Sequence, residues 1–314
     1  MALAVLSGDE QCIIFSQLCN TLHPGVAVAF GSISNELRTL TQGLLQQLRA
    51  DHEGAAALCR KAGMRSCKKL RDAKQVVWTH KGLHAADLTT LGKLGSVLPA
   101  LGTLYLIESS GSAGLDGVQR LAEELGAGAL PAVIFLSLCG MHVGDAGASA
   151  LAAALDQGAM PRLKHLTLFR TAIGDAGLVA LAPALRGRLL PALDRLSLDG
   201  NPFGDEGLAA LVAPPLPAGA PPPPAGGLTK LRMLSLQGTQ VSDAGCATLI
   251  AALYSGALPA LNFINVHGIP ASAAAMAAVQ ELARPIHVIA RRPSWQLRSP
   301  GSRSLLTRIS EYLL

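Results

Sequence analysis

Four aspartates recur in a Gly-Asp-x-Gly pattern or a close variant of it, and their carboxylates are the first candidates for chemistry. They are Asp145, Asp175, Asp205 and Asp243. This spacing predicts either a ladder of cation ligands or a series of caps on helix N-termini. We favour capping, because a hard cation needs several oxygen ligands at one point and each segment offers only one. An aspartate at a loop-to-helix junction can instead accept orphan backbone N–H groups.

The cysteines and histidines are scattered through the chain. The six cysteines include no C-x-x-C pair, which argues against a zinc site and against a disulfide scaffold. We expect reduced thiols that mostly fill the core, in a protein of the cytoplasm or nucleus. No P-loop, H-E-x-x-H or G-x-S-x-G motif occurs. The sequence therefore predicts no catalytic residue, no metal, no cofactor and no enzymatic activity.

Composition excludes further classes of protein. Of the 314 residues, 50% are hydrophobic and 15% charged, whereas a disordered chain has low hydrophobicity and high charge. No apolar run approaches the ~18 residues that a membrane span needs. The first residues lack the basic region of a secretory signal, so we expect none.

The net charge of +5 is concentrated in two basic clusters, over residues 60–74 and 284–308. Such clusters can attract nucleic acid or acidic partners. No aromatic residues alternate with the first cluster, as stacking of single-stranded bases would require. We interpret the clusters as a solvated helix face and a solvated tail, and we do not expect a nucleic-acid partner.

A repeated L-x-x-L-x-L pattern indicates the elements that would position these residues. The pattern ends in an apolar residue every 30 to 38 positions, and a helical Ala/Leu-rich stretch follows each time. Those final residues are Leu106, Leu138, Leu168, Leu198, Leu236 and Val266. A degenerate earlier copy has Val76 and Trp78 as its strand pair. Alternation predicts a strand with one buried face, so we expect seven strand-helix units between residues 73 and 284.

These units resemble leucine-rich repeats of the long, ribonuclease-inhibitor-like type, over about two thirds of the chain. The resemblance implies an α/β leucine-rich-repeat solenoid (a horseshoe) with a parallel concave sheet and outer helices. The family usually has a buried Asn or Cys three residues after the last strand Leu. Here that position holds Lys81, Ser109, Met141, Thr171, Asn201, Thr239 and Ile269. Only Asn201 fits fully, which predicts looser loops along that edge.

The flanking regions lack the repeat. We predict that residues 1–72 form an all-helical N-terminal cap. One helix starts at Ser7, another runs through Leu48, Asp51 caps a third, and a short basic helix begins at Ser66. This region also weakly resembles an F-box. A Pro-rich insertion occupies residues 214–227, where we expect an exposed polyproline loop, and residues 285–314 form a basic C-terminal tail.

The predicted function is a non-catalytic scaffold that binds a protein or peptide on the concave face of the repeats. Two alternatives remain open: an F-box-type substrate adaptor of a ubiquitin ligase, and a GTPase-activating regulator of the Ran-activator type, although the latter carry an acidic tail.

Strand alternation places the third, fifth and seventh residues of each unit on the concave face. Four of the nine Phe and Tyr residues fall among these 21 positions, where chance would place fewer than one. Aromatic side chains dominate binding hot spots. The predicted contact residues are Tyr105, Ile107, Phe135, His165, Phe169, Arg195, Met233 and Phe263.

Overall fold

The computed structural model describes residues 19–33, 35–108, 113–187, 190–212 and 228–283. By its internal contacts the chain divides into two compact units, residues 1–283 and 284–314, and all described residues belong to the first. The Pro-rich insertion and the basic tail lie outside the described residues.

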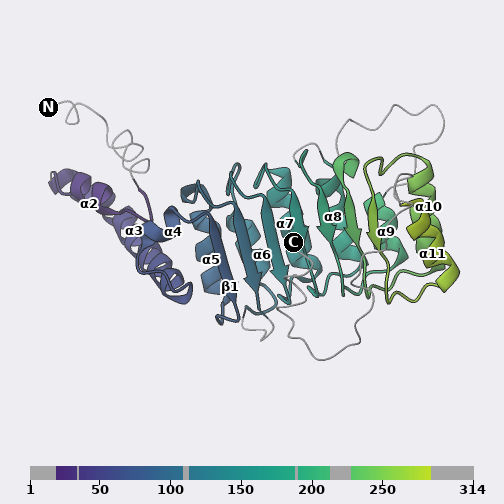
Figure 1. Cartoon of the computed structure of the whole chain (residues 1–314). Coiled ribbons are helices and arrows are strands. Elements are labelled where there is room, and N and C mark those ends of the chain that lie inside the picture. Colours follow the sequence, from purple (N-terminus) through teal and green to yellow (C-terminus); the bar gives the residue numbers. More distant parts are fainter. Residues whose placement is uncertain (1–18, 34, 109–112, 188–189, 213–227, 284–314) are drawn as a thin grey trace. The chain divides into compact units, whose positions relative to one another are not determined.

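One parallel sheet runs through the first unit, and its seven strands follow one another in chain order (Figure 1). The strands are β1 Gln75–Thr79, β2 Thr103–Ile107, β3 Phe135–Cys139, β4 His165–Thr167, β5 Arg195–Ser197, β6 Met233–Ser235 and β7 Phe263–Asn265. The third residue of each predicted unit pairs with the third residue of the next, as in Phe135 with His165 and His165 with Arg195. The predicted register is therefore confirmed across all seven strands.

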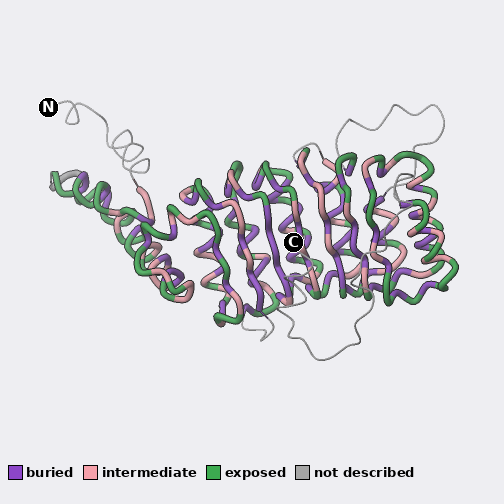
Figure 2. Tube along the Cα trace, viewed as in Figure 1, coloured by how far each residue is buried: buried purple, intermediate pink, exposed green. Residues whose placement is uncertain are grey.

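A helix follows each strand and packs on the same face of the sheet (Figure 1). These helices are α5 Ala85–Lys93, α6 Gly117–Glu124, α7 Gly144–Asp156, α8 Asp175–Arg186, α9 Asp205–Val212, α10 Asp243–Tyr254 and α11 Ala273–Leu282, with short 3-10 turns η2 Leu94–Val97 and η3 Leu228–Lys230. The core lies between the helices and the sheet, where strand Leu166 and Leu196 and helix Leu181 are at most 1% exposed. Figure 2 shows buried residues concentrated along the strands. The predicted solenoid is confirmed.

Among the described residues, three helices precede the sheet: α2 Gly25–Gly31, α3 Asn35–Lys61 and α4 Cys67–Arg71. Leu58 of α3 and Leu70 of α4 belong to the same hydrophobic core as the repeats, so this end of the helical region covers the first repeat. Ser66 caps α4 by accepting a hydrogen bond from the Lys69 N–H, as predicted. The expected helix from Ser7 falls on residues 1–18, outside the described residues.

The predicted helix start at Asp51 is wrong, because α3 continues through this position without a break. Asp51 lies inside α3, where its carboxylate accepts a hydrogen bond from the Gln47 side chain at 2.9 Å and from Lys93 of α5 at 3.3 Å. One side-chain hydrogen bond within α3 and one from α5 thus take the place of the backbone N–H groups that Asp51 was predicted to cap. The next turn packs closely on α5: a Cβ at Gly54 would lie 3.1 Å from Thr90.

The four recurring aspartates do accept helix N-terminal N–H groups, but those of the following repeat rather than of their own helix. Asp175 is the first residue of α8, and its Oδ1 accepts from the Gly204 and Gly207 N–H groups at 2.8 and 2.7 Å. The other three carboxylates each reach the residue six positions after the final apolar residue of the next L-x-x-L-x-L pattern. These bonds join Asp145 to Gly174 N, Asp205 to Ser242 N and Asp243 to Ser272 N. We call this series the aspartate ladder.

The second glycine of three of these segments, at Gly177, Gly207 and Gly245, makes room for this ladder. A Cβ at Gly177 would overlap the Asp145 carboxylate and lie 2.9 Å from the Asp145 Cα. A Cβ at Gly207 would lie 2.9 Å from Asp175 Oδ1. The close packing at these glycines is therefore explained by an inserted carboxylate.

The loops after the strands are held more firmly than the departures from the family pattern predicted. Asn201 is buried, and its Oδ1 accepts from the Thr171 and Ile173 N–H groups at 3.0 and 3.1 Å while its Nδ2 donates to Leu168 and Leu198 carbonyls. The Thr171 and Thr239 hydroxyls each donate to the carbonyl three residues earlier. Hydroxyl groups thus supply part of what asparagine supplies at the same position.

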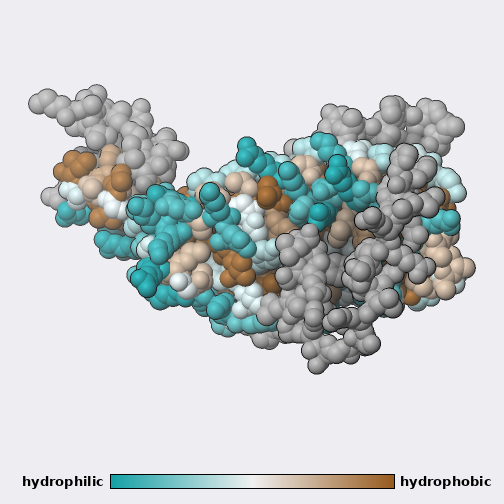
Figure 3. All heavy atoms as spheres, viewed as in Figure 1, coloured by the Kyte–Doolittle hydropathy of each residue, from teal (hydrophilic) through white to brown (hydrophobic). Residues whose placement is uncertain are grey.

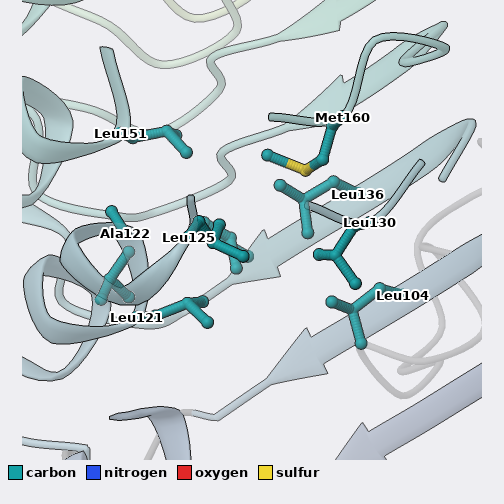
Figure 4. Close-up of a pocket in the computed structure, with 10 residues that line it drawn as sticks. Leu104, Leu121, Ala122, Leu125, Leu130, Leu136, Leu151 and Met160 are labelled. Carbon is teal, nitrogen blue, oxygen red and sulfur yellow. The ribbon is translucent and has the colours of Figure 1, made fainter. Parts of the chain in front are cut away.

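A small apolar pocket remains between β2, β3 and helices α6 and α7 (Figure 4). Its ten lining side chains are all apolar, including Leu121, Leu125 and Met160. A ligand site usually adds a few convergent polar groups to apolar walls, so we interpret this space as imperfect core packing.

Among the described residues, no helix combines the length and apolarity needed to cross a membrane.

Candidate binding surface

The face of the sheet opposite the helices carries the predicted contact residues. Ile107, Phe135 and Cys139 are buried, yet none of the three belongs to the core between sheet and helices. Their burial instead reflects packing on the concave side, where strands lie only ~4.8 Å apart and neighbouring side chains cover one another. The prediction placed these side chains on the correct face but did not anticipate that Phe135 would be only 8% exposed.

Three rings form a continuous row across β2, β3 and β4. The rings of Tyr105 and Phe135 have centroids 4.7 Å apart and are tilted by 37°. Phe135 also meets His165 edge-to-face at 5.7 Å. Both distances fall in the favourable range for aromatic pairs. We call Tyr105, Phe135 and His165 the aromatic row; its outer members are half-buried and flank the buried Phe135.

Positive charge surrounds a single carboxylate beside this row. Asp194, just before β5, has its carboxylate oxygens 3.8 Å from His165 Nε2, 4.0 Å from Arg195 Nε and 3.7 Å from Arg232 Nε. Lys164 is exposed on the neighbouring strand start. We call Lys164, Arg195 and Arg232 the cationic cluster. One carboxylate among three permanent cations leaves an excess of positive charge at the surface.

The pKa of His165 is lowered by burial and by the nearby Arg195 guanidinium. The ring is therefore predominantly neutral at pH 7 and serves as an aromatic and hydrogen-bonding group rather than as a cation. Its neighbour across the row behaves similarly, since burial raises the pKa of Tyr105 and keeps the phenol protonated.

Polar groups line the concave face beyond the aromatic row. Asp199 is buried, and its carboxylate accepts from the Gln237 N–H at 2.7 Å and from the Ser197 hydroxyl at 3.0 Å. Burial raises the pKa of this carboxyl group. Ser137 and Cys139 contact each other at 3.0 Å on β3, and burial raises the pKa of the Cys139 thiol. The hydrogen bonds of these groups are made within the protein, and the groups form a polar part of the concave face.

The remaining predicted contact residues are not gathered at one point. Phe169 is half-buried after β4 and lies under the Arg170 guanidinium, 5.2 Å from its centroid. Met233 is half-buried on β6, and Phe263 on β7 is 45% exposed. The structure thus brings Tyr105, Phe135 and His165 together and leaves the other five predicted residues spread from β2 to β7.

Sequence reasoning missed two acidic residues of this region. Asp194 precedes the strand, outside the alternating positions that define the concave face. Glu108 follows β2, and its buried carboxylate accepts from the Gly82 and Leu83 N–H groups and lies 3.7 Å from His80. A signal for Glu108 existed, because a lone acid directly after an apolar strand must find donors when it is buried.

The geometry of the described residues offers no cluster of three or more His, Cys, Asp or Glu side chains suited to a metal ion. The aspartates that suggested a cation ladder lie one per repeat, and each accepts backbone N–H groups.

Comparison with known proteins supports the repeat assignment. Residues 160–182 and 193–212 match the family model described as leucine-rich repeat, and no curated protein matches the sequence. Among solved structures, actin-binding site 2 of leiomodin-1 is 16% identical with a TM-score of 0.35, and covers 56% of this chain and 88% of its own. An internalin of Listeria monocytogenes is 14% identical with a TM-score of 0.28, and 72% of each chain is covered. Both TM-scores are low, so neither match carries an argument about what this chain binds.

Proposed function

Because the chain is a leucine-rich repeat protein whose units form one unbroken sheet, we propose that it is a non-catalytic scaffold that binds a protein partner on the concave face. Leucine-rich repeats in general imply protein-interaction scaffolds. The observation that carries the more specific proposal is the aromatic row. Three rings, with Phe135 in contact with both Tyr105 and His165, lie on a sheet face outside the core and supply a rigid aromatic surface at little cost in side-chain entropy.

The cationic cluster beside the row adds a preference for charge. Arg232 has 68% of its side chain exposed and shares Asp194 with Arg195. A carboxylate of the partner would add the second acid that the cluster lacks. We therefore expect the bound segment to present an apolar side chain against the aromatic row and an acidic side chain one or two strands away.

The size of the face fits a protein segment better than a metabolite. Seven strands at ~4.8 Å spacing extend over about 29 Å. The small apolar pocket lined by Leu121, Leu125 and Met160 lies on the other side of the sheet, between the strands and the helices. The F-box-type and Ran-activator alternatives stay untested predictions.

A quantitative affinity capture with matched variants tests this proposal. Phe135→Ala removes the centre of the aromatic row, and His165→Ala removes an outer member. Tyr254→Ala is the control, because Tyr254 ends α10 on the helical side and is 77% exposed. We expect proteins retained by the wild type and by Tyr254→Ala to be lost from both row variants, with an affinity loss of about 2 kcal/mol or more.

Thermal melting by circular dichroism shows whether each variant is folded. His165→Ala keeps the test decisive if Phe135→Ala unfolds, because His165 is half-buried and its removal leaves the ring of Phe135 in place. Unchanged retention by a folded His165→Ala variant and by a folded Phe135→Ala variant would remove the aromatic row as the partner site.

A further inference from the structure

Residues 60–74 hold an extreme concentration of charge at the first-repeat end of the array. Seven basic residues stand here against the single acid Asp72, whereas the entire chain has a net charge of only +5. The segment alone therefore carries more positive charge than the whole molecule, and the rest of the chain is close to neutral.

The fold orients these side chains outward. Cys67 and Leu70 are the buried residues of α4 and fix its inner face to the core, so Lys68 and Lys69 project from the opposite face. The end of α3, the loop after it and the approach to β1 supply the other exposed cations. The basic patch consists of Arg60, Arg65, Lys68, Lys69 and Lys74, all of them exposed. Figure 3 shows hydrophilic atoms gathered over α3 and α4.

The remaining two basic residues of the segment are neutralised, but those of the patch are not. Lys61 forms an ion pair with Asp87, and Arg71 pairs with Asp72 at 3.1 Å. Within the part of the chain that the structure describes, no carboxylate lies within 4 Å of a basic-patch side chain. Like charges held together raise the free energy of the isolated molecule, and an anionic partner relieves that repulsion.

We propose that the basic patch is a second interaction surface and that it binds an acidic peptide segment of a protein. The patch is formed by a helix end, a loop and the five-residue α4, which suits a short stretch of carboxylates. Binding of single-stranded nucleic acid relies on aromatic side chains on which bases stack, and no aromatic residue occurs between residues 60 and 74.

The position of Lys74 also favours a protein. Lys74 directly precedes β1, whose residues Gln75 and Val77 are exposed on the concave face of the sheet. A polypeptide that lies across the concave face can continue over the first strand onto the basic patch. This second argument rests on the proposed function, whereas the charge argument does not.

Fluorescence anisotropy with a labelled oligoglutamate peptide of about ten residues measures the patch directly at low salt, where screening is weak. The test variant combines Lys68→Gln, Lys69→Gln and Lys74→Gln. The control combines Arg38→Gln, Arg162→Gln and Lys230→Gln, which removes the same charge from exposed positions elsewhere. We expect the patch variant to weaken binding at least about tenfold, or about 1.4 kcal/mol, and the control to weaken it less than about twofold.

Two further measurements make the outcome decisive. Equal weakening by both variants would overturn the proposal, since it would show attraction by net charge alone. Tighter patch-dependent binding of a single-stranded DNA of equal charge would also overturn it, in favour of nucleic acid. Oligoglutamate binding by the lysine variants reports on the basic patch, whereas affinity capture by the row variants reports on the aromatic row, so failure of the one site and failure of the other are distinguishable.

Discussion

The repeats from β3 onward and the first two repeats solve the same problem in different ways. Every repeat must satisfy backbone N–H groups where its loop meets the next unit. From β3 onward the aspartate ladder does this with one residue type at one position, seven residues after the final apolar residue of the L-x-x-L-x-L pattern. In the first two repeats that position holds Ala85 and Ala113. There the buried Glu108 accepts from Gly82 and Leu83, and Asp87 accepts from the His84 N–H at 2.8 Å.

The difference shows that stacking of repeats depends on satisfied N–H groups rather than on a particular acid. The regular repeats reuse one bond, whereas the irregular ones recruit acids from a strand end and from the third position of a helix. Lys61 of α3 joins the second arrangement through its ion pair with Asp87. The irregular boundary therefore also ties the helical cap to the first repeat.

The largest effects should come from the core that both regions share. Trp78→Ala in the first repeat should lower the free energy of unfolding by about 3–5 kcal/mol and Leu166→Ala in the fourth by about 2–5 kcal/mol, because both side chains are at most 1% exposed. Urea denaturation followed by circular dichroism measures both. A single transition in both variants would show that the two regions unfold together. Two transitions in Trp78→Ala alone would show that the irregular repeats unfold separately.

Glycine substitutions should separate ladder positions from ordinary helix positions. Gly177→Ala should cost about 1–3 kcal/mol, because the added methyl overlaps the Asp145 carboxylate and nothing nearby can yield freely. Gly43→Ala is the control: Gly43 lies exposed inside α3 with no atom within 4 Å of an added Cβ. That change should stabilise the protein by about 0.4–1 kcal/mol. Thermal melting checks this: the melting temperature should fall in Gly177→Ala and rise in Gly43→Ala. Equal shifts of the two melting temperatures would contradict the ladder geometry.

Removal of one ladder carboxylate should have a smaller effect. Asp175→Ala deprives the Gly204 and Gly207 N–H groups of their acceptor and should cost about 1–2 kcal/mol. Asp175→Asn keeps an oxygen acceptor and should cost less. Chemical denaturation gives both values. If the asparagine and alanine variants were equally unstable, the carboxylate would act through its charge on the helix and not through these hydrogen bonds.

The smallest effect should appear in the pH dependence of stability at Asp199. Because burial raises the pKa of this carboxyl group, the native state retains its proton to a higher pH than the unfolded chain does. Stability from this group is therefore complete below the unfolded pKa of about 3.9 and is lost as the pH rises through the native pKa. Asp199→Asn should remove this dependence, so the melting temperature of the wild type relative to the variant should fall from pH 3 to pH 7. A constant difference would contradict the assignment.

The strand spacing was sufficient to predict the sheet, its register and the buried leucines. Alternation has a period of two residues, so a fixed L-x-x-L-x-L position determines which side of the sheet each side chain occupies. It does not determine what covers that side. Phe135 was therefore placed correctly, but its contacts with Tyr105 and His165 depend on rotamers and on the pairing of three strands.

The target of the aspartates required geometry that a local reading lacks. A capping signal is normally interpreted within its own helix, whereas Asp175 acts on residues about 30 positions later. The joint recurrence of Asp and Gly at fixed spacing carried the information, because Gly177, Gly207 and Gly245 each leave space for the carboxylate of the preceding repeat. Asp51 shows the converse error: a residue type favoured at helix starts occurs inside α3, where no glycine or proline at that point ends the helix.

The aspartate ladder also makes the array extensible. Each acceptor and its donor are separated by one whole unit, so a tandem duplication of a middle repeat would bring its own aspartate for the unit ahead and its own N–H group for the unit behind. The copied module would join the array with every such bond intact and no new residue needed. The series has defined limits, since Ala113 occupies the ladder position before its first member and Ala273 occupies it in the last repeat. Growth by duplication is therefore open to the units between β3 and β7 and closed at both ends.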